Sequence, residues 1–299
     1  MNTTTNLAER AMLVSLKIRR WQATRTDKKV SAEIAATHGV SERRAGHYRK
    51  HAIDVNAASF KAVVSAGSEL RNKHYELTLP WGQDGARILT TEMFETYSNE
   101  MRHLKSTFER VVREFVSDYP VLKAAAKREL NGMYNEGDYP TDIAARFEAG
   151  WSVMPLPEAE DFRAHLSRET VAEIRKEIEV ELERTTAEAM RDPFKRIHDH
   201  VSRMVERLSK DDAVFRDTLV TGLADLCAIL PGLNLTNDAK LDDLRKRCEK
   251  MIANLDPEDL RQVPTVRSRV AKQAKAIQKE VQKIQDGMAA FMGYAEEAA

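Results

Sequence analysis

The chain has 299 residues, of which 42% are hydrophobic and 31% are charged, a composition that excludes wholesale disorder. No stretch approaches the roughly 20 consecutive apolar residues of a membrane span, and the first residues lack the basic start and apolar block of a signal peptide. The two cysteines, Cys227 and Cys248, are too few for a disulfide framework. We therefore expect a cytoplasmic protein that makes no contact with a membrane.

The net charge is zero, from 47 basic and 47 acidic residues, but the charges are unevenly distributed. Residues 1–75 carry a net +8, residues 76–165 a net −6, and residues 166–299 a net −2. Most of the positive excess lies within residues 10–50, which hold 11 lysines and arginines against 3 acidic residues. Asymmetry of this kind concerns the partners of a protein more than its fold.

The first part of the chain predicts a basic N-terminal helical module over residues 1–75. Its apolar residues recur at helical spacing, with basic residues between them, and Gly39 separates two short stretches that are expected to be helical. The expected helices span residues 6–26, 31–38, 41–52 and 57–75. A cluster of proline and glycine between residues 80 and 85 then forbids a continuous helix.

Residues 76–155 are predicted to form a helical middle region. Apolar residues recur at three- and four-residue spacing over 91–118, which is typical of an amphipathic helix. Pro120 is expected to end this helix and to start a shorter one that reaches about residue 132. A short helix is expected near 141–149, and at most a short β ribbon near 151–163.

Residues 156–299 are predicted to form a C-terminal half of long helices. Ser167 is the expected N-cap of a helix that runs to Leu208, with a kink or break at Pro193. Further helices are expected over 211–229, 237–253 and 265–292. The last has apolar residues at the alternating spacing of a coiled-coil seam; they are Val270, Ala274, Ile277, Val281, Ile284, Met288 and Phe291. The fold class is thus mainly α, an elongated helical bundle with long coiled-coil-like helices.

The segment Ser31–Lys50 resembles a helix-turn-helix in its layout. Gly39 occupies the turn, where a left-handed backbone suits glycine, and Ile34, Val40 and Tyr48 lie where apolar residues would hold two helices together. In this interpretation the second helix enters the major groove of DNA. The alternative is an ordinary helical corner with a hydrated basic face, because such spacing often occurs by chance in helical proteins.

The residues that we assign to nucleic-acid contact lie in this segment or just before it. They are Arg19, Arg20, Arg25, Lys28, Lys29, Ser41, Arg43, Arg44, His47, Arg49 and Lys50. Basic side chains supply phosphate affinity that depends on salt, and a recognition helix would present Ser41, Arg43 and His47 to base edges. DNA is favoured over RNA as the partner.

Two further features each have two interpretations. Trp21 lies among the basic residues, where it could stack on an unpaired base, but we favour an anchor in the core. A basic stripe on the 265–292 helix could follow a phosphate backbone, but we favour the hydrated flank of a helical bundle. The stripe consists of Lys272, Lys275, Lys279 and Lys283.

The sequence shows no catalytic constellation, so we expect a protein that is not an enzyme and needs no metal or cofactor. It contains no Walker loop, no dinucleotide-binding glycine motif and no HExxH zinc motif. His198 and His200 are two residues apart and would point about 200° from one another on a helix, so they cannot easily share one ion. His47 and His51 are four apart but lack a carboxylate at matching spacing.

Seven short phrases stand out along the chain. They are Lys17–Trp21, Asp27–Val30, His74–Trp81, Asp138–Pro140, Asp161–Arg163, Phe215–Leu219 and Leu230–Thr236. Together they resemble a family of tailed-phage and prophage proteins known only as a domain of unknown function. The resemblance implies a phage protein in the cytoplasm of a bacterial host, encoded near phage DNA-metabolism genes and an AAA+ ATPase gene. It implies no catalytic or binding residues, because none is established for the family.

The leading hypothesis is a non-enzymatic phage accessory protein that binds nucleic acid through residues 10–50. The alternative is an assembly or adaptor protein whose residues 265–292 contact another protein, such as an AAA+ ATPase, or a second copy of the chain. An exposed basic surface on residues 10–50 would favour the first hypothesis. An exposed apolar strip along residues 265–292 would favour the second.

Overall fold

The computed structural model describes residues 7–82, 85–159, 167–210, 216–253 and 255–297. About 70% of these residues are helical, and the strands among them form a small antiparallel sheet and a two-stranded ribbon. The prediction of a mainly α fold is therefore confirmed. None of the helices in these ranges is long and apolar enough to span a membrane.

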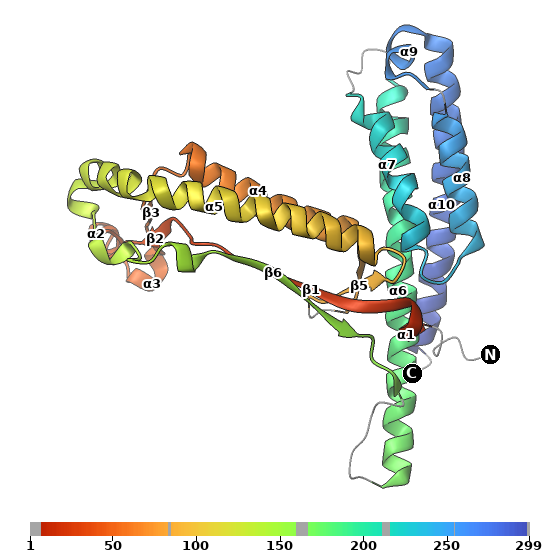
Figure 1. Cartoon of the computed structure of the whole chain (residues 1–299), viewed down its shortest axis with the longest axis horizontal. Helices are drawn as coiled ribbons and strands as arrows, with labels where there is room; N and C mark the ends of the chain where they lie inside the picture. The colour runs from red at the N-terminus through yellow and green to blue at the C-terminus, as the bar shows by residue number, and fades with distance from the viewer. Residues whose placement is uncertain (1–6, 83–84, 160–166, 211–215, 254, 298–299) are drawn as a thin grey trace. The chain divides into compact units, whose positions relative to one another are not determined.

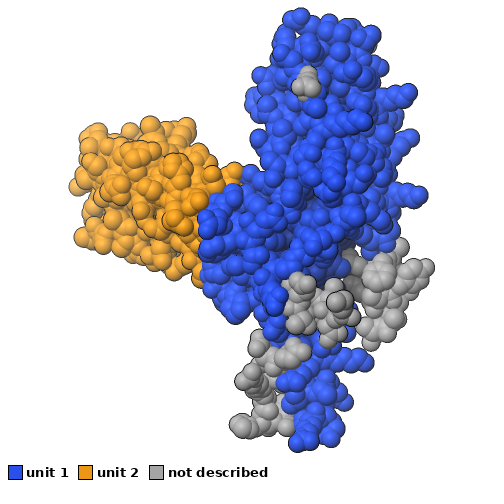
Figure 2. Space-filling view, turned by 45° about the vertical axis from the view of Figure 1, so that its right-hand side comes forward, with its two compact units in different colours: residues 1–15, 75–96, 153–299 blue, residues 16–74, 97–152 orange. Residues whose placement is uncertain are grey.

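The chain forms two compact units, which Figure 2 distinguishes by colour. Unit 1 comprises residues 1–15, 75–96 and 153–299, and unit 2 comprises residues 16–74 and 97–152. Each unit thus combines segments that are distant in sequence, whereas the sequence pattern indicated three consecutive regions.

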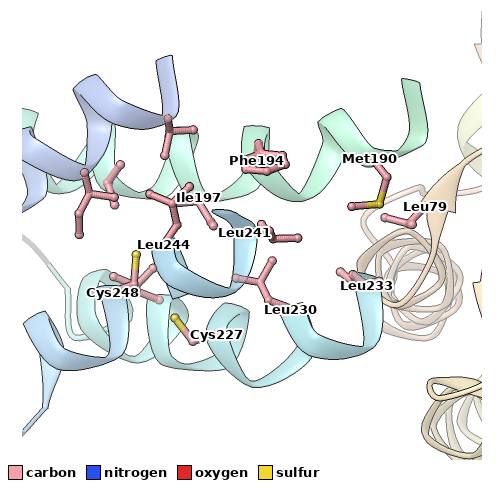
Figure 3. Packing of buried hydrophobic residues seen from close by; sticks show 14 of the residues in the cluster. Leu79, Met190, Phe194, Ile197, Cys227, Leu230, Leu233, Leu241, Leu244 and Cys248 are labelled. Carbon is pink, nitrogen blue, oxygen red and sulfur yellow. The ribbon is translucent and has the colours of Figure 1, made fainter. Parts of the chain in front are cut away.

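Helices make up most of unit 1. They are α6 (Arg168–Leu208), α7 (Thr218–Leu233), α8 (Ala239–Ile252), α9 (Pro257–Gln262) and α10 (Pro264–Glu297). Figure 1 shows α6, α7, α8 and α10 side by side as a bundle. In its core Phe194 of α6 lies near Leu230 of α7 and Leu241 of α8, and all three side chains are buried (Figure 3). Burial of this apolar surface is what holds the bundle together.

The longest helices of unit 1 begin close to where the sequence predicted. Ser167 is the N-cap of α6, where its hydroxyl accepts a hydrogen bond from the backbone N–H of Thr170. The seam residues of α10 from Val270 to Val281 are buried, and α10 packs along α6 of the same chain. Phe291, the last residue of the predicted seam, lies outside the described side chains.

Two prolines lie inside helices that they were expected to interrupt. Pro193 is within α6, and Pro120 is within α5 (Phe94–Leu130), which continues through the predicted break. A proline in a helix removes one backbone hydrogen bond, which costs about 3 kcal/mol. Pro120 is exposed, so water can satisfy the freed carbonyl. Pro193 is buried next to Phe194, and the packing of this segment offsets the lost bond.

The small sheet is larger than the ribbon that the sequence suggested. Its strands, in spatial order, are β4 (Leu79–Pro80), β5 (Arg87–Thr90), β1 (Ala11–Arg19) and β6 (Glu148–Pro155). β6 includes the start of the region in which a short ribbon was expected, near 151–163. Residues 160–163 of that region lie outside the described residues.

The predicted helix over residues 6–26 is wrong, because most of this stretch is strand. The antiparallel register of β1 and β5 places Leu13 opposite Ile88 and Val14 opposite Arg87. Leu13 and Val14 are consecutive, and both are buried. Side chains on both faces of β1 are therefore covered. The strand lacks the alternation of apolar and polar residues that marks a half-buried strand.

Most of α4 (Ala58–Glu76) and of α5 belongs to unit 2, where these helices enclose an aromatic cluster. The ring of Trp21 lies 6.3 Å from that of Phe60 and 5.8 Å from that of Tyr119, measured between centroids. Trp21 is only 5% exposed. It is a core anchor, as favoured above, and the alternative role in base stacking is wrong.

Short elements occupy the remaining connections. The 3-10 helices are η1 (Asn131–Met133), η2 (Glu136–Asp138) and η3 (Ala144–Arg146), and a four-residue helix, α1 (Leu7–Arg10), precedes β1. Of these, only η3 lies in the region near 141–149 where a helix was expected, and the chain enters the sheet directly after it, at Glu148.

Candidate nucleic-acid interface

Residues 24–51 of unit 2 fold into a β-α-α-β arrangement, which we call the 24–51 motif. It consists of β2 (Thr24–Thr26), α2 (Lys28–Thr37), α3 (Glu42–Ala45) and β3 (Arg49–His51). β2 and β3 pair in antiparallel register, with Arg25 opposite Lys50. Figure 1 shows the motif beside the loop that follows α5. It contains most of the residues that the sequence assigned to nucleic-acid contact.

The 24–51 motif is not a helix-turn-helix, which corrects the prediction. α3 has four residues, or about 6 Å of helix, where a second helix over 41–52 was expected. Gly46, with φ at 79°, ends α3, and pairing with β2 then fixes the following residues as a strand. Gly39 does adopt the predicted left-handed conformation, with φ at 60°. The residues from 41 to 50 therefore do not share one helical face.

Asp27 organises the motif, because all of its polar groups are used. Its carboxylate caps α2 by accepting the N–H of Val30, and its other carboxylate oxygen lies 3.1 Å from Lys50 Nζ. Its own backbone N–H donates to the carbonyl of Tyr48 at 3.0 Å, and its carbonyl accepts the hydroxyl of Ser31 at 2.6 Å. The Ser31 hydroxyl in turn accepts the N–H of Tyr48 at 3.0 Å. Both backbone polar groups of Tyr48 are thus bound to the start of α2.

Lys50 is buried in an ion cluster and cannot contact nucleic acid, so its assignment to the interface is corrected. Its ammonium group lies 3.1 Å from carboxylate oxygens of both Asp27 and Asp138 and also donates to the carbonyl of Met133. The lysine side chain is 5% exposed. Burial opposes its charge, but the bonds to the two aspartates outweigh burial and raise the pKa of Lys50. The bonds from the Val30 N–H and from Lys50 lower the pKa of Asp27.

Three further assigned residues have partners inside the protein. Arg19 forms an ion pair with Glu148 at 3.3 Å, and Arg20 donates to a backbone carbonyl of α4. Arg25 lies over the ring of Trp21, 5.3 Å from its centroid, and donates to backbone carbonyls nearby. These guanidinium groups stabilise unit 2, and each would have to exchange a protein partner for a phosphate.

The other seven assigned residues are exposed. They are Lys28, Lys29, Ser41, Arg43, Arg44, His47 and Arg49. Among the described residues, none of these seven side chains takes part in an ion pair or a side-chain hydrogen bond. Residues 28–49 therefore expose five permanent cations against the two carboxylates of Glu33 and Glu42, a net of +3.

Apolar side chains are exposed beside these cations. Ile34 is 37% exposed, Val40 is 43% exposed and Tyr48 is 38% exposed. The sequence interpretation placed all three between two helices, and this is wrong. With four residues α3 is too short to cover them, and the buried residues of α2 are Ser31 and Ala35 rather than Ile34. The motif thus exposes both apolar and cationic side chains.

Cations elsewhere in the described chain are commonly paired. On α5 Lys105 pairs with Glu109, and on α6 Arg184 lies 2.6 Å from carboxylate oxygens of both Glu181 and Glu188. The lysines of the α10 stripe are exposed and, among the described residues, also take part in no ion pair, but they flank a helix whose apolar seam is buried. A paired surface cation binds an external anion more weakly, because the neighbouring carboxylate already offsets its positive charge.

The histidines of α6 do not suggest a metal site. His200 Nε2 lies 3.2 Å from the carbonyl of Leu219, and His198 Nδ1 lies 3.7 Å from a carboxylate oxygen of the neighbouring Asp199. Within the residues that the structure describes, no group of three histidine, cysteine or acidic side chains is placed to hold a metal ion. Cys227 and Cys248 are buried free thiols.

The sequence interpretation missed the residues that position the interface. Asp27, Ser31 and Asp138 hold Tyr48 and Lys50 in place, but only Asp27 carries a local signal. An aspartate directly before a helix is a typical N-cap. The roles of Ser31 and Asp138 depend on contacts with distant parts of the chain, which spacing does not reveal.

Comparison with known proteins gives no family for the chain. No protein-family model, no curated protein and no solved structure matches it. Membership of the tailed-phage family that the sequence phrases suggested therefore stays a prediction.

Proposed function

We propose that the protein binds nucleic acid through the exposed cations of the 24–51 motif. The observation that carries this proposal is the set of five exposed cations in residues 28–49 that have no ion-pair or hydrogen-bond partner among the residues that the structure describes. They are Lys28, Lys29, Arg43, Arg44 and Arg49. A surface of this kind attracts a polyanion, and each contact with a phosphate releases condensed counterions.

The backbone geometry supports the proposal, because it brings cations from different elements together. Lys28 begins α2, and the preceding residue bonds to the carbonyl of Tyr48, which directly precedes Arg49. Arg43 and Arg44 lie on α3, which packs against α2. A nucleic-acid strand that crosses this surface would meet several cations within a short distance. Rigid backbone support reduces the entropy cost of binding.

The adaptor hypothesis has less support. The seam of α10 from Val270 to Val281 is buried within the chain, so this face is not available to another protein. A partner would have to use a different surface of α10. We also propose that the protein works in a phage-infected bacterial cell. This part of the proposal is based only on the seven short phrases that resemble the tailed-phage family.

Charge reversal at Arg43 and Arg44 tests the proposed interface. We expect the Arg43→Glu/Arg44→Glu variant to bind a labelled oligonucleotide on the order of 100-fold more weakly than the wild type at about 0.15 M salt, because two phosphate contacts become repulsive. Fluorescence anisotropy measures the affinity. Both side chains are exposed and have no ion-pair partner within the described part of the chain, so the melting temperature should stay within a few degrees.

A matched control reverses two exposed lysines of unit 1. The Lys272→Glu/Lys275→Glu variant changes the net charge by the same amount but leaves the 24–51 motif intact. We expect it to bind like the wild type. Equal losses in the two variants would indicate a nonspecific charge effect and would contradict the proposed interface. Loss in the control alone would place the contact on the α10 stripe.

A further inference from the structure

We infer that the nucleic acid bound by the 24–51 motif is single-stranded, with Tyr48 as the platform on which a base stacks. The inference rests on the proposed function and narrows it to one class of ligand. It follows from the length of α3, from the exposure of Tyr48, and from the way in which the backbone of Tyr48 is fixed.

The motif has no element that suits the major groove of a duplex. A recognition helix must project side chains over several turns into a groove about 12 Å wide. α3 provides four residues, and Gly46 then turns the chain away into β3. α2 is longer, but its exposed face carries the carboxylate of Glu33, which repels phosphate, and the hydroxyl of Thr37 already donates to the carbonyl of Glu33.

The same surface suits unpaired bases. Bases in a single strand expose apolar ring faces, which stack on aromatic side chains, while the phosphates bind nearby cations. Tyr48 is 38% exposed and lies between His47 and Arg49, both exposed. The hydroxyl of Ser31 accepts the N–H of Tyr48, and the exposed Ile34 lies one turn after Ser31 on α2.

The position of Tyr48 is fixed from both sides of its backbone. Its N–H is bound by Ser31 and its carbonyl by Asp27, and both bonds measure 3.0 Å. Two residues later Lys50 is anchored in the buried ion cluster with Asp27 and Asp138. A ring on such a rigid support loses little conformational entropy when a base stacks on it. Ser31 and Lys50 therefore act as positioning residues for Tyr48.

The experiment compares ligands and variants in one anisotropy assay with the full chain. The probes are oligothymidylate and oligouridylate of about 20 nucleotides and a mixed-sequence DNA duplex of the same length, at about 0.15 M salt. We expect both single strands to bind at least about 10-fold more tightly than the duplex, because only they expose base faces. The two single-stranded probes distinguish DNA from RNA as the preferred source of the strand.

The variants test the role of the ring itself. Tyr48→Ala should weaken single-strand binding on the order of 10-fold or more, whereas Tyr48→Phe should retain it, because stacking needs the ring and not the hydroxyl. Phe94→Ala is a matched control, since Phe94 is 39% exposed and lies outside the motif. It should bind like the wild type.

Each outcome separates this inference from the proposed function. Equal binding of duplex and single strands, or unchanged affinity in Tyr48→Ala, would overturn the inference that the ligand is single-stranded. In either case, loss of binding in Arg43→Glu/Arg44→Glu would still support the proposed interface. Absence of binding to all three probes would overturn both. Loss in Tyr48→Ala together with retention in Tyr48→Phe supports the stacking platform.

Discussion

Replacement of Lys50 by methionine is expected to lower the free energy of unfolding by about 3–5 kcal/mol, because it leaves the largely buried carboxylates of Asp27 and Asp138, which are 11% and 16% exposed, without their shared cation. Methionine keeps most of the volume of the lysine stem, so the loss reflects charge rather than a cavity. Urea denaturation at pH 7 measures the effect. Lys28→Met is the control, because Lys28 is exposed and forms no ion pair with any described residue, and its effect should stay within about 0.5 kcal/mol.

The pH dependence of this variant has a predictable sign. In the wild type the pKa of Asp27 is lowered, so its contribution to stability is present above its unfolded pKa and is lost as pH falls through the folded pKa. Without Lys50 two largely buried carboxylates adjoin with no cation between them, which should raise the pKa of a carboxyl group and make the variant relatively more stable at low pH. The difference between wild type and Lys50→Met should therefore shrink from pH 7 toward pH 4. A constant difference, or one below about 1 kcal/mol at pH 7, would contradict the role of the cluster.

Replacement of Ile277 by aspartate should destabilise unit 1 by about 4 kcal/mol or more. Ile277 is 3% exposed in the seam by which α10 packs along α6, so the substitution buries an unpaired charge. Thermal unfolding followed by circular dichroism measures the loss. Lys275→Asp introduces the same side chain two residues away on the exposed side, and we expect only a small change there. An unchanged melting temperature in Ile277→Asp would show that the seam is not a buried interface.

The sequence predicts best those features whose causes are local. The Ser167 cap and the buried seam from Val270 to Val281 follow from residue type and spacing within one helix. The excess of cations in residues 10–50 is likewise visible from composition. These signals are reliable because the residues that produce them lie within a few turns of one another.

The features that were missed depend on distant partners. The stretch from residue 11 to 19 is strand because β5, more than sixty residues later, pairs with it. Lys50 looked like one more exposed cation, but the carbonyl that it binds is that of Met133, 83 residues further along the chain. The helix-turn-helix interpretation failed for the same reason, since pairing of β3 with β2 overrides the helical spacing after Gly46.

The salt dependence of single-strand affinity tests the nucleic-acid interface most directly. If the five cations of residues 28–49 bind phosphates, the logarithm of the association constant should fall linearly with the logarithm of salt concentration, with a slope of up to about −3.5 for five contacts. Neutralising Arg43 and Arg44 with glutamine should reduce the magnitude of that slope by about 1.4. Absence of binding at near-physiological salt, or an unchanged slope in the glutamine variant, would contradict the interface.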